Sequence, residues 1–405
     1  MYHRIDKSKL QNGGIRMPKI VWWLVIGMAI NVTGSSFLWP MHTIYMNEFL
    51  DQSLTTAGII LMLNALTGVI GSLFGGWLFD RIGSKKTLRI AVIFVLVCLI
   101  GLVLNHDWPI YAVLLILIGF GYGVIVPVIY ALAGIVWPSG GRKTFNAIYL
   151  AQNLGVSIGT AAAGFVAQIS FDYIFYANLM LFFVFVIIAF TQFNYEVPEE
   201  DQQMQAQLTN INVEMNRARF ITLIMACGVF FLCWTGYVQW QTTIATYTQQ
   251  LNISLSQYGL IWTANGLLIL LGQPLIRPIV KRYEDRLNIQ LIIGLSIFIV
   301  AFVFTSFQVA FTGFLIGMII MTFGEMFVWP ALPTIANQLA PKGKQGSYQG
   351  VVTSTATLGR AVGPLAGGII VDMYNMQVLF LVIVGFLFVG YIFIALYNKR
   401  AKGVV

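Results

Sequence analysis

One acidic residue lies deep inside an apolar stretch of this chain, and it is the first candidate for chemistry. Glu325 stands within the run MTFGEMFVWPALP, residues 321–333, and is the only acid well inside a long apolar segment. A carboxyl group in a low-dielectric interior is costly to ionise, and it can bind and release a proton as its surroundings change. We expect Glu325 to carry a proton or to bind a lipophilic cation. The alternatives are a structural ion pair and a permanently protonated, hydrogen-bonded acid.

Arg360 is the one basic residue inside an apolar segment, and we expect it to tune Glu325. The turn between their two segments centres near Lys342, with Glu325 17 residues before it and Arg360 18 residues after it. At a helical rise of about 1.5 Å per residue, both lie roughly 25 Å from that turn. Equal depth allows an ion pair in one state and a free carboxyl group in another. The alternative is that Arg360 faces a different polar group.

Polar and aromatic side chains recur at similar depths in other segments and could line a cavity around Glu325. Asn146, Tyr149 and Asn153 share one helical face, because residues three and four apart are neighbours. Aromatic walls beside a carboxylate suit lipophilic cations through dispersion and cation–π contact, although a single Trp or Tyr is more often an interface anchor. The predicted cavity residues are Asn31, Ser35, Trp39, Tyr122, Asn146, Tyr149, Asn153, Trp234, Tyr237, Gln241 and Trp329.

Long apolar helices must position these residues. The 405-residue chain is 58% hydrophobic and only 9% charged, and its recurrent apolar runs of 18 or more residues are typical of a helical membrane protein. No Cys or His cluster has metal-ligand spacing and no nucleotide-binding loop is visible, so we expect no metal, no cofactor and no ATP hydrolysis. The twelve predicted spans are 20–47, 55–79, 86–104, 109–136, 143–170, 172–195, 217–248, 255–280, 288–306, 308–339, 346–372 and 375–397.

The basic residues predict how these spans are oriented. With the N-terminus inside the cell, 22 of the 23 Lys and Arg residues fall in cytoplasmic segments, and Arg360 is the exception. We therefore expect a multi-pass plasma-membrane protein with both termini in the cytoplasm. The net charge of +8 then reflects membrane orientation and not nucleic-acid binding. No cleavable signal peptide is expected, because the first apolar run is too long for one.

The two halves of the chain repeat each other. LGVSIGTAAAG and LGRAVGPLAGG, from residues 154 and 358, share their glycine spacing, and Asn64 and Arg81 recur as Asn265 and Arg282. FGYGVIVP and FGEMFVWP begin at residues 120 and 323, so Tyr122 and Glu325 occupy equivalent positions in the repeat. Such a repeat predicts a binding site near the membrane midplane, between the halves. The predicted divisions are an N-terminal segment 1–19, a six-helix bundle 20–195, a linker 196–216, a second bundle 217–397 and a tail 398–405.

The sharpest local motif is GGWLFDRIGSKKTLR, residues 75–89, in the loop after the second span. Glycine permits close helix packing and a tight turn, and an acid at a helix end can accept hydrogen bonds from a neighbouring helix N-terminus or an Arg. We expect Asp80 to latch the cytoplasmic ends of the halves, through Arg142 or through the helix start near Gly346 and Ser347. The predicted gate residues are Gly76, Asp80, Arg81, Gly83, Lys85 and Arg142.

This motif is similar to the loop signature of the major facilitator superfamily, G-x-L-x-D-R-x-G-x-K-K. The resemblance extends over the whole chain, through the twelve spans, the central linker and the half repeats. It implies an all-α membrane protein with twelve transmembrane helices in two pseudo-symmetric six-helix bundles. It also implies Asp80 as the latch, whereas the two lysines need only reflect the orientation rule.

Within that superfamily, the segments 121–164 and 323–352 resemble bacterial drug/proton antiporters, including a lactococcal multidrug transporter. In that branch a glutamate matching Glu325 takes part in the handling of cationic drugs and protons. The fourth span here lacks an Arg that many of these antiporters carry, and the G-P-x-x-G-G pattern lies in the eleventh span instead of the fifth. Ile135, Ile148 and the region 239–241 replace further membrane acids of the lactococcal protein, which argues against divalent cations as substrates and against the coupling of several protons.

The resulting hypothesis is a proton-coupled secondary transporter that exports lipophilic, cationic small molecules by alternating access, in the manner of multidrug efflux. We expect a monomer in the lipid bilayer, driven by the proton gradient. The alternative is a transporter of one dedicated polar solute or lipid-linked precursor, since Asn146, Gln152, Asn153 and Gln241 offer amides. An enzyme is disfavoured because no second acid, Ser/His pair or metal cluster accompanies Glu325. The repeat and the loop motif disfavour a non-transporting scaffold.

Overall fold

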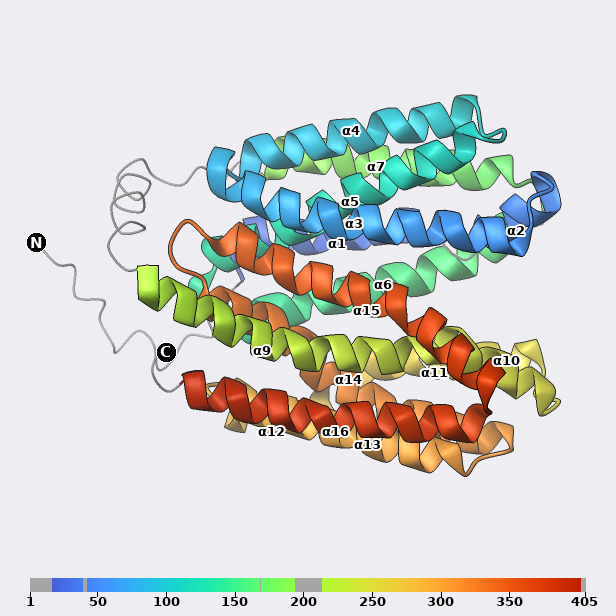
Figure 1. Cartoon of the computed structure of the whole chain (residues 1–405). Helices are drawn as coiled ribbons and strands as arrows, with labels where there is room; N and C mark the ends of the chain where they lie inside the picture. The colour runs from blue at the N-terminus through green and yellow to red at the C-terminus, as the bar shows by residue number, and fades with distance from the viewer. Residues whose placement is uncertain (1–16, 39–41, 168, 194–212, 402–405) are drawn as a thin grey trace, which may run out of the picture.

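The computed structural model describes residues 17–38, 42–167, 169–193 and 213–401, and within these ranges every regular element is a helix (Figure 1). Trp39, residues 1–16, residues 402–405 and most of the predicted linker lie outside the described residues. The long helices run along a common axis in two groups. This arrangement agrees with the predicted all-α membrane fold.

The first half contains α1 (Lys19–Leu38), α2 (His42–Ile44), the π-helix η3 (Tyr45–Phe49), α3 (Leu54–Ile82), α4 (Ser84–Leu104), α5 (Ile110–Val136), the 3-10 turn η4 (Pro138–Gly140), α6 (Arg142–Ala167) and α7 (Asp172–Gln192). The second half contains α9 (Val213–Tyr237), the 3-10 turn η5 (Val238–Gln241), α10 (Thr243–Gln250), α11 (Leu255–Leu271), α12 (Gln273–Arg282), α13 (Leu287–Ser306), α14 (Phe311–Leu339), α15 (Gln345–Met373) and α16 (Met376–Ala401). Each half follows one copy of the repeat seen in the sequence.

The helices account for the twelve predicted spans. Nine helical stretches in the described residues are long and apolar enough to cross a membrane, and the bent pair α11–α12 forms a tenth. The remaining two are α6 and α15, which are 26 and 29 residues long but carry many more polar side chains. Both of these helices form hydrogen bonds to the opposite half, so part of their polar surface faces protein.

Three predicted spans prove to be interrupted. The span 20–47 is not α-helical throughout its described residues, because the π-helix η3 begins at Tyr45. The span 217–248 contains the 3-10 turn η5 between α9 and α10. The span 255–280 bends by 53° between α11 and α12, where Pro274 lies in the first turn of the second piece. Proline has no backbone N–H and favours the first turn of a helix, so a new helix axis starts there.

Buried hydrophobic residues form two clusters, one for each half, and Tyr149 of the first half belongs to the second-half cluster. Where α3 crosses α15 the backbones meet closely, because a Cβ atom on Gly76 would collide with the carbonyl of Gly346. Gly350 makes the same kind of contact with the carbonyl of Ser72. Small residues let two helices approach in this way, and van der Waals contact then holds the halves together.

The contacts between the halves favour one end of the bundle. We call this the basic end; α3, α5 and α14 finish there and α4, α6 and α15 begin there, with Lys85, Lys143 and Lys344 at or just before the helix starts. Hydrogen bonds and close glycine contacts between the halves run from the basic end to the middle of the bundle. The described conformation is therefore closed at the basic end.

Candidate functional site

Glu325 lies at the centre of a buried hydrogen-bond network in the middle of the bundle. It is the fifteenth of the 29 residues of α14 and is only 2% exposed. Its Oε1 accepts a hydrogen bond from the Tyr149 hydroxyl at 2.9 Å, and its Oε2 accepts one from Asn265 Nδ2 at 3.1 Å. Asn265 also donates to Thr322 Oγ1 at 2.9 Å, and the hydroxyl of Tyr237 is a further polar neighbour of the carboxyl group.

The partners of Glu325 are all neutral. No Lys or Arg among the described residues forms an ion pair with it. A phenol hydroxyl can donate or accept, so this network can hold the carboxyl group with or without its proton. A carboxylate that depends on hydrogen bonds instead of a fixed cation is free to change its protonation state when those bonds change.

The network joins the two halves, because Tyr149 belongs to α6 of the first half whereas Asn265 belongs to α11 of the second. The same face of α6 makes two more contacts across the interface. Asn146 Nδ2 donates to Gln273 Oε1 at 3.1 Å, and Arg142 Nη2 donates to the carbonyl of Met326 at 2.7 Å. Residues 142, 146 and 149 recur at helical spacing, so α6 presents one polar edge to the second half.

A proline explains why Arg142 binds where it does. Pro330 lies inside α14 and has no N–H, so the carbonyl of Met326, four residues earlier, lacks its helical partner. Arg142 is buried and supplies the missing donor from the other half, with a longer contact to the carbonyl of Phe327 at 3.4 Å. The proline in the Glu325 run therefore creates an acceptor for the opposite half.

Aromatic rings of the second half pack together beside Glu325. Trp329 lies 4.7 Å from Trp234, 5.4 Å from Tyr237 and 5.5 Å from Phe298, measured between ring centroids. Trp234 and Tyr237 are themselves 5.5 Å apart. We call Trp234, Tyr237 and Trp329 the aromatic cluster. All three were predicted as cavity residues from the sequence, and the structure brings them together.

Arg360 contacts this cluster at Trp234. It is the sixteenth of the 29 residues of α15, so it shares the mid-helix depth of Glu325. Its guanidinium carbon lies 4.9 Å from the centroid of a Trp234 ring, and its Nη2 donates to Thr357 Oγ1 at 3.2 Å. Arg360 and Glu325 are thus held apart in this conformation, and the ion pair considered from the sequence is not formed here.

Asp80 binds the start of α15 in the second half. Its Oδ1 accepts the backbone N–H of Gly346 at 2.8 Å, and its Oδ2 accepts the backbone N–H of Ser347 at 2.8 Å. The Ser347 hydroxyl also hydrogen-bonds to Oδ2. A carboxylate at a helix N-terminus is stabilised by the unpaired N–H groups and by the helix dipole. Two partners were predicted for Asp80, the start of α15 and Arg142. The structure shows the start of α15 in this role, whereas Arg142 binds the Met326 carbonyl of α14.

The other predicted gate residues surround this contact. Gly83 has a φ of 83°, which glycine adopts without strain, and it separates α3 from α4. Arg81 lies over the ring of Trp77 at 5.2 Å, and Lys85 lies in the first turn of α4. These residues shape the basic end and do not reach Glu325's network.

Several predicted cavity residues are not brought to Glu325. Asn31 is buried in α1, and the Ser35 hydroxyl donates to the Val32 carbonyl of its own helix. Tyr122 packs within the first half against Phe182, and Asn153 donates to the Tyr149 carbonyl. Gln241 lies in η5, and Trp39 is outside the described residues. Depth along a helix therefore did not determine which of these side chains would meet.

The sequence interpretation missed Asn265 and Thr322 as partners of Glu325. A signal for Asn265 was present, since it matches Asn64 in the half repeat. Asn64 donates to the Leu115 carbonyl of α5, whereas Asn265 donates to side chains of α14, which is the helix that corresponds to α5. The repeat thus keeps the asparagine and the helix pairing, and the second half redirects the amide to the carboxylate.

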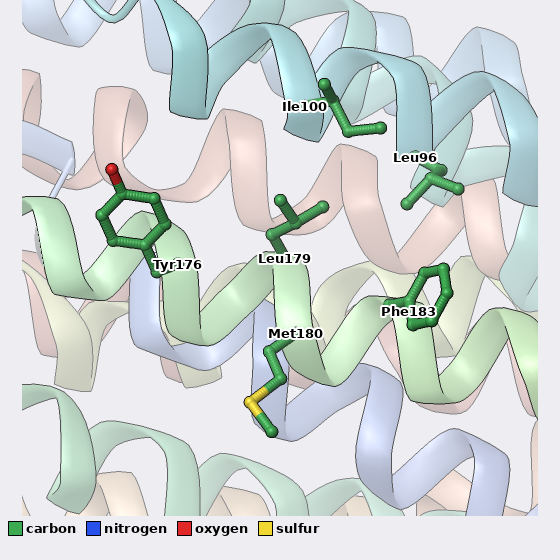
Figure 2. Close-up of a pocket in the computed structure, with 6 residues that line it drawn as sticks. All are labelled: Leu96, Ile100, Tyr176, Leu179, Met180 and Phe183. Atoms are coloured by element: carbon green, nitrogen blue, oxygen red, sulfur yellow. The ribbon is translucent and has the colours of Figure 1, made fainter.

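A separate pocket of about 310 Å³ lies between α4 and α7 (Figure 2). Its six lining residues are Leu96, Ile100, Tyr176, Leu179, Met180 and Phe183. Met180 and Phe183 are exposed by 71% and 53%, as expected for side chains that face lipid. This pocket contains no charged group and lies outside the Glu325 network, so it is not part of the candidate site.

The sequence matches the family model of the Major Facilitator Superfamily over residues 24–247 and 225–404, which is almost the whole chain. The chain belongs to the Major Facilitator Superfamily. It is accordingly a multi-pass membrane transporter with the twelve-helix fold of that family. The fold predicted from the sequence is confirmed.

Two bacterial members of the superfamily illustrate its relatives. The uncharacterised MFS-type transporter YttB of Bacillus subtilis (strain 168) is 50% identical over 386 residues, which cover 95% of this chain and 97% of YttB. The quinolone resistance protein NorA of Staphylococcus aureus (strain MSSA476) is 23% identical over 364 residues, which cover 88% of this chain and 91% of NorA.

Solved structures of other transporters share the fold. The human organic anion transporter MFSD10 (TETRAN) superposes with a TM-score of 0.77 at 14% identity, covering 93% of this chain and 99% of that one. A POT family transporter in complex with 5-aminolevulinic acid gives a TM-score of 0.73 at 16% identity, covering 96% and 98%. At these identities the likeness concerns the fold alone.

Proposed function

We propose that this major facilitator chain is a proton-coupled antiporter that exports lipophilic, cationic small molecules across the bacterial plasma membrane. Both termini lie in the cytoplasm, the basic end faces the cytoplasm, and one monomer is the working unit, driven by the proton gradient. The observation that carries the proposal is Glu325, a buried acid whose hydrogen-bond partners come from both halves. The distant similarity to a quinolone resistance protein supports the choice of substrate class.

The coupling follows from the origin of these partners. In alternating access the two halves rock about a site between them. Tyr149 is on the first half and Glu325 on the second, so their hydrogen bond exists only while the halves meet at the basic end. Asn265 is on the same half as Glu325 and stays with it. The two orientations therefore offer the carboxyl group different hydrogen-bond surroundings, which is what links protonation to conformation.

The closed basic end supports assigning this conformation to the outward-facing state. Asp80 holds α15 through backbone donors, and Arg142 holds α14 through the Met326 carbonyl. Opening toward the cytoplasm must break both sets of contacts. A substrate that reaches Glu325 and the aromatic cluster from the cytoplasm then competes with the proton, and release follows when the basic end closes again.

A dedicated transporter of neutral polar solutes receives less support. That alternative depended on amide side chains being available to bind the solute. Three of the four predicted amides instead form hydrogen bonds within the protein. Asn146 binds Gln273, Asn153 binds the Tyr149 carbonyl, and Gln152 accepts from the Tyr130 hydroxyl at 2.9 Å. The groups left to face a substrate are mainly aromatic rings and charges, which favour lipophilic ions.

The test is pH-gradient-driven transport of a cationic rhodamine dye into or out of proteoliposomes. Wild-type protein is expected to accumulate the dye against its gradient, and Glu325→Gln is expected to lose accumulation while it keeps its fold. Asp372→Asn is the matched control, because Asp372 is an exposed acid far from the site, next to the last residue of α15. Concentrative transport by Glu325→Gln would refute the role of Glu325, and no transport by wild-type protein of any cationic dye would refute the substrate class.

A further inference from the structure

Arg360 has no acidic partner in the described structure, although it lies mid-helix. Apart from its bond to Thr357 and its contact with Trp234, its guanidinium N–H groups make no hydrogen bond among the described residues. Both neighbours are neutral, so the positive charge is not compensated. A charge at membrane depth is costly unless it is paired or faces a water-filled space, and such residues generally mark a functional site.

The direction of Arg360 follows from the face of α15 that meets lipid. That face is the exposed stripe Leu358, Val362, Leu365 and Ile369, whose spacing is that of one helical side. At 3.6 residues per turn, Arg360 points roughly 180° away from this stripe. Arg360 is nevertheless an exposed residue. Its accessible surface therefore faces the inside of the protein and not lipid.

The neighbours of α15 show toward which part of the protein Arg360 points. On one flank Gly359 and Gly363 touch α9, and on the other flank Gly350 and Ser354 touch α3 of the opposite half. Arg360 lies between these two flanks. It therefore points into the space between the two halves, where the substrate of an alternating-access transporter must bind.

We propose that Arg360, Trp234 and Thr357 form a binding site for an acidic group of the transported compound, so that aromatic compounds carrying both a carboxylate and a cationic group are substrates. This proposal rests on the proposed transport function and deepens it. A guanidinium matches a carboxylate with two parallel hydrogen bonds, and Trp234 adds a flat surface for an attached ring. The Thr357 hydroxyl fixes one edge of the guanidinium and leaves the other edge free.

The aromatic cluster connects this site to Glu325. Trp234 lies under Arg360, Tyr237 lies beside the Glu325 carboxyl group, and the two rings are 5.5 Å apart. An aromatic compound can lie along these rings with its cationic group toward Glu325 and its carboxylate toward Arg360. Opposite charges at the two ends of the cluster thus select amphoteric compounds over compounds with a single charge.

The test compares two probes that differ only in one ionisable group, tetramethylrhodamine with a free carboxyl group and its methyl ester. Their affinities for the purified full-length protein in detergent are measured by fluorescence anisotropy. Arg360→Gln is expected to weaken binding of the carboxylate probe by about 10- to 100-fold, the loss of a charged hydrogen-bonded pair. Arg360→Lys keeps the charge without the planar fork and is expected to fall in between.

The ester probe and a second arginine provide the controls. The ester is expected to change its affinity by less than about threefold in Arg360→Gln, since it offers no negative charge. Arg282→Gln removes an arginine that lies 5.8 Å from an aromatic ring at the basic end, outside the site, and is expected to change neither affinity. Size-exclusion profiles and melting temperatures check that each variant is folded.

Three results would overturn the site: equal loss for both probes, no loss for the carboxylate probe, or no binding of the carboxylate probe to wild-type protein. Equal loss for both probes would indicate that Arg360 acts on Glu325 in another conformation. The proposed function can fail separately. Suppose that the preference for the carboxylate probe disappears in Arg360→Gln, but wild-type protein shows no pH-gradient-driven transport. The binding site would then be supported, and proton-coupled export would be refuted.

Discussion

The two halves of the repeat share a scaffold and differ in the groups at equivalent positions. Glu325 of the second half corresponds to Tyr122 of the first, and Arg360 corresponds to Val156. The Tyr122 hydroxyl is buried within its own half beside Asn178, whereas Glu325 accepts a hydrogen bond from the opposite half. At these two pairs of positions the charged residues belong to the second half, and the first half supplies the neutral Tyr149 to Glu325. The repeat accounts for the shared helices, and the difference between its copies accounts for the charged groups at positions 325 and 360.

The contacts at the basic end show a second asymmetry. Asp80 follows the second span of the first half and accepts two backbone N–H groups and a hydroxyl from α15. Lys281 occupies the position equivalent to Asp80 in the second half, and the acid of that loop is Glu284, which faces Lys143 of α6 at 3.9 Å with both side chains exposed. A carboxylate at a helix N-terminus is held by directed bonds, whereas an exposed ion pair is screened by water. The first-half latch is therefore the stronger one.

The largest expected effect concerns Glu325 and the equivalent residue of the first half, Tyr122. Glu325→Gln should abolish proton-driven dye accumulation, because the amide cannot exchange a proton. Tyr122→Phe, at the equivalent position, should lower the transport rate by less than about threefold, since its hydroxyl serves only packing within the first half. Initial rates in proteoliposomes measure both, and equal losses in the two variants would show that the halves are not chemically distinct.

The contribution of the first half to Glu325 can be tested at Tyr149. Tyr149→Phe removes the hydroxyl that donates to Oε1, and we expect the transport rate to fall by about tenfold, the scale of one hydrogen bond to a charged group. The equivalent residue in the second half is Thr353, whose hydroxyl donates to the Gln349 carbonyl of its own helix. Thr353→Val should therefore have little effect on the same rate, and a loss as large as that of Tyr149→Phe would contradict this assignment.

The two latches can be compared through the accessibility of Ser72, which is buried under α15. In a background with Cys98, Cys227 and Cys233 replaced by Ala, Ser72→Cys provides a site for a membrane-impermeant maleimide. Asp80→Asn should speed labelling from the basic end by about tenfold, because a neutral amide holds the helix N-terminus less strongly. Glu284→Gln should change the rate by less than about twofold, as expected for an exposed pair. The reverse order would show that the second-half latch dominates.

The smallest expected effect concerns the prolines of the repeat. Pro330→Ala gives position 330 an N–H that can bind the Met326 carbonyl and compete with Arg142, so labelling at position 72 should rise about two- to threefold. Pro127 occupies the equivalent position in α5, and no arginine reaches across to its helix among the described contacts. Pro127→Ala should leave the labelling rate unchanged. A rise in both variants would indicate general loosening of the helices.

Much of the architecture was predictable because a membrane restricts the options. Apolar length and charge distribution predicted the helices, the half repeat predicted equivalent positions, and a helix-end acid predicted a partner at the start of α15. Helix rotation was not predictable, since it depends on packing between helices. For that reason Asn265 and Thr322 were missed, and the equal depth of Arg360 and Glu325 did not reveal that Arg360 lies over Trp234. The bend at Gln273 was also missed, because the run reads as one apolar segment.

The central claim is that Glu325 exchanges a proton as substrate binds. It is tested most directly by measuring proton release when tetramethylrhodamine methyl ester is added to purified protein in weakly buffered detergent solution containing a pH indicator. Wild-type protein should release protons in proportion to bound dye at a pH where the carboxyl group is protonated, and Glu325→Gln should bind dye without release. Equal proton release from wild-type protein and from Glu325→Gln would contradict the account.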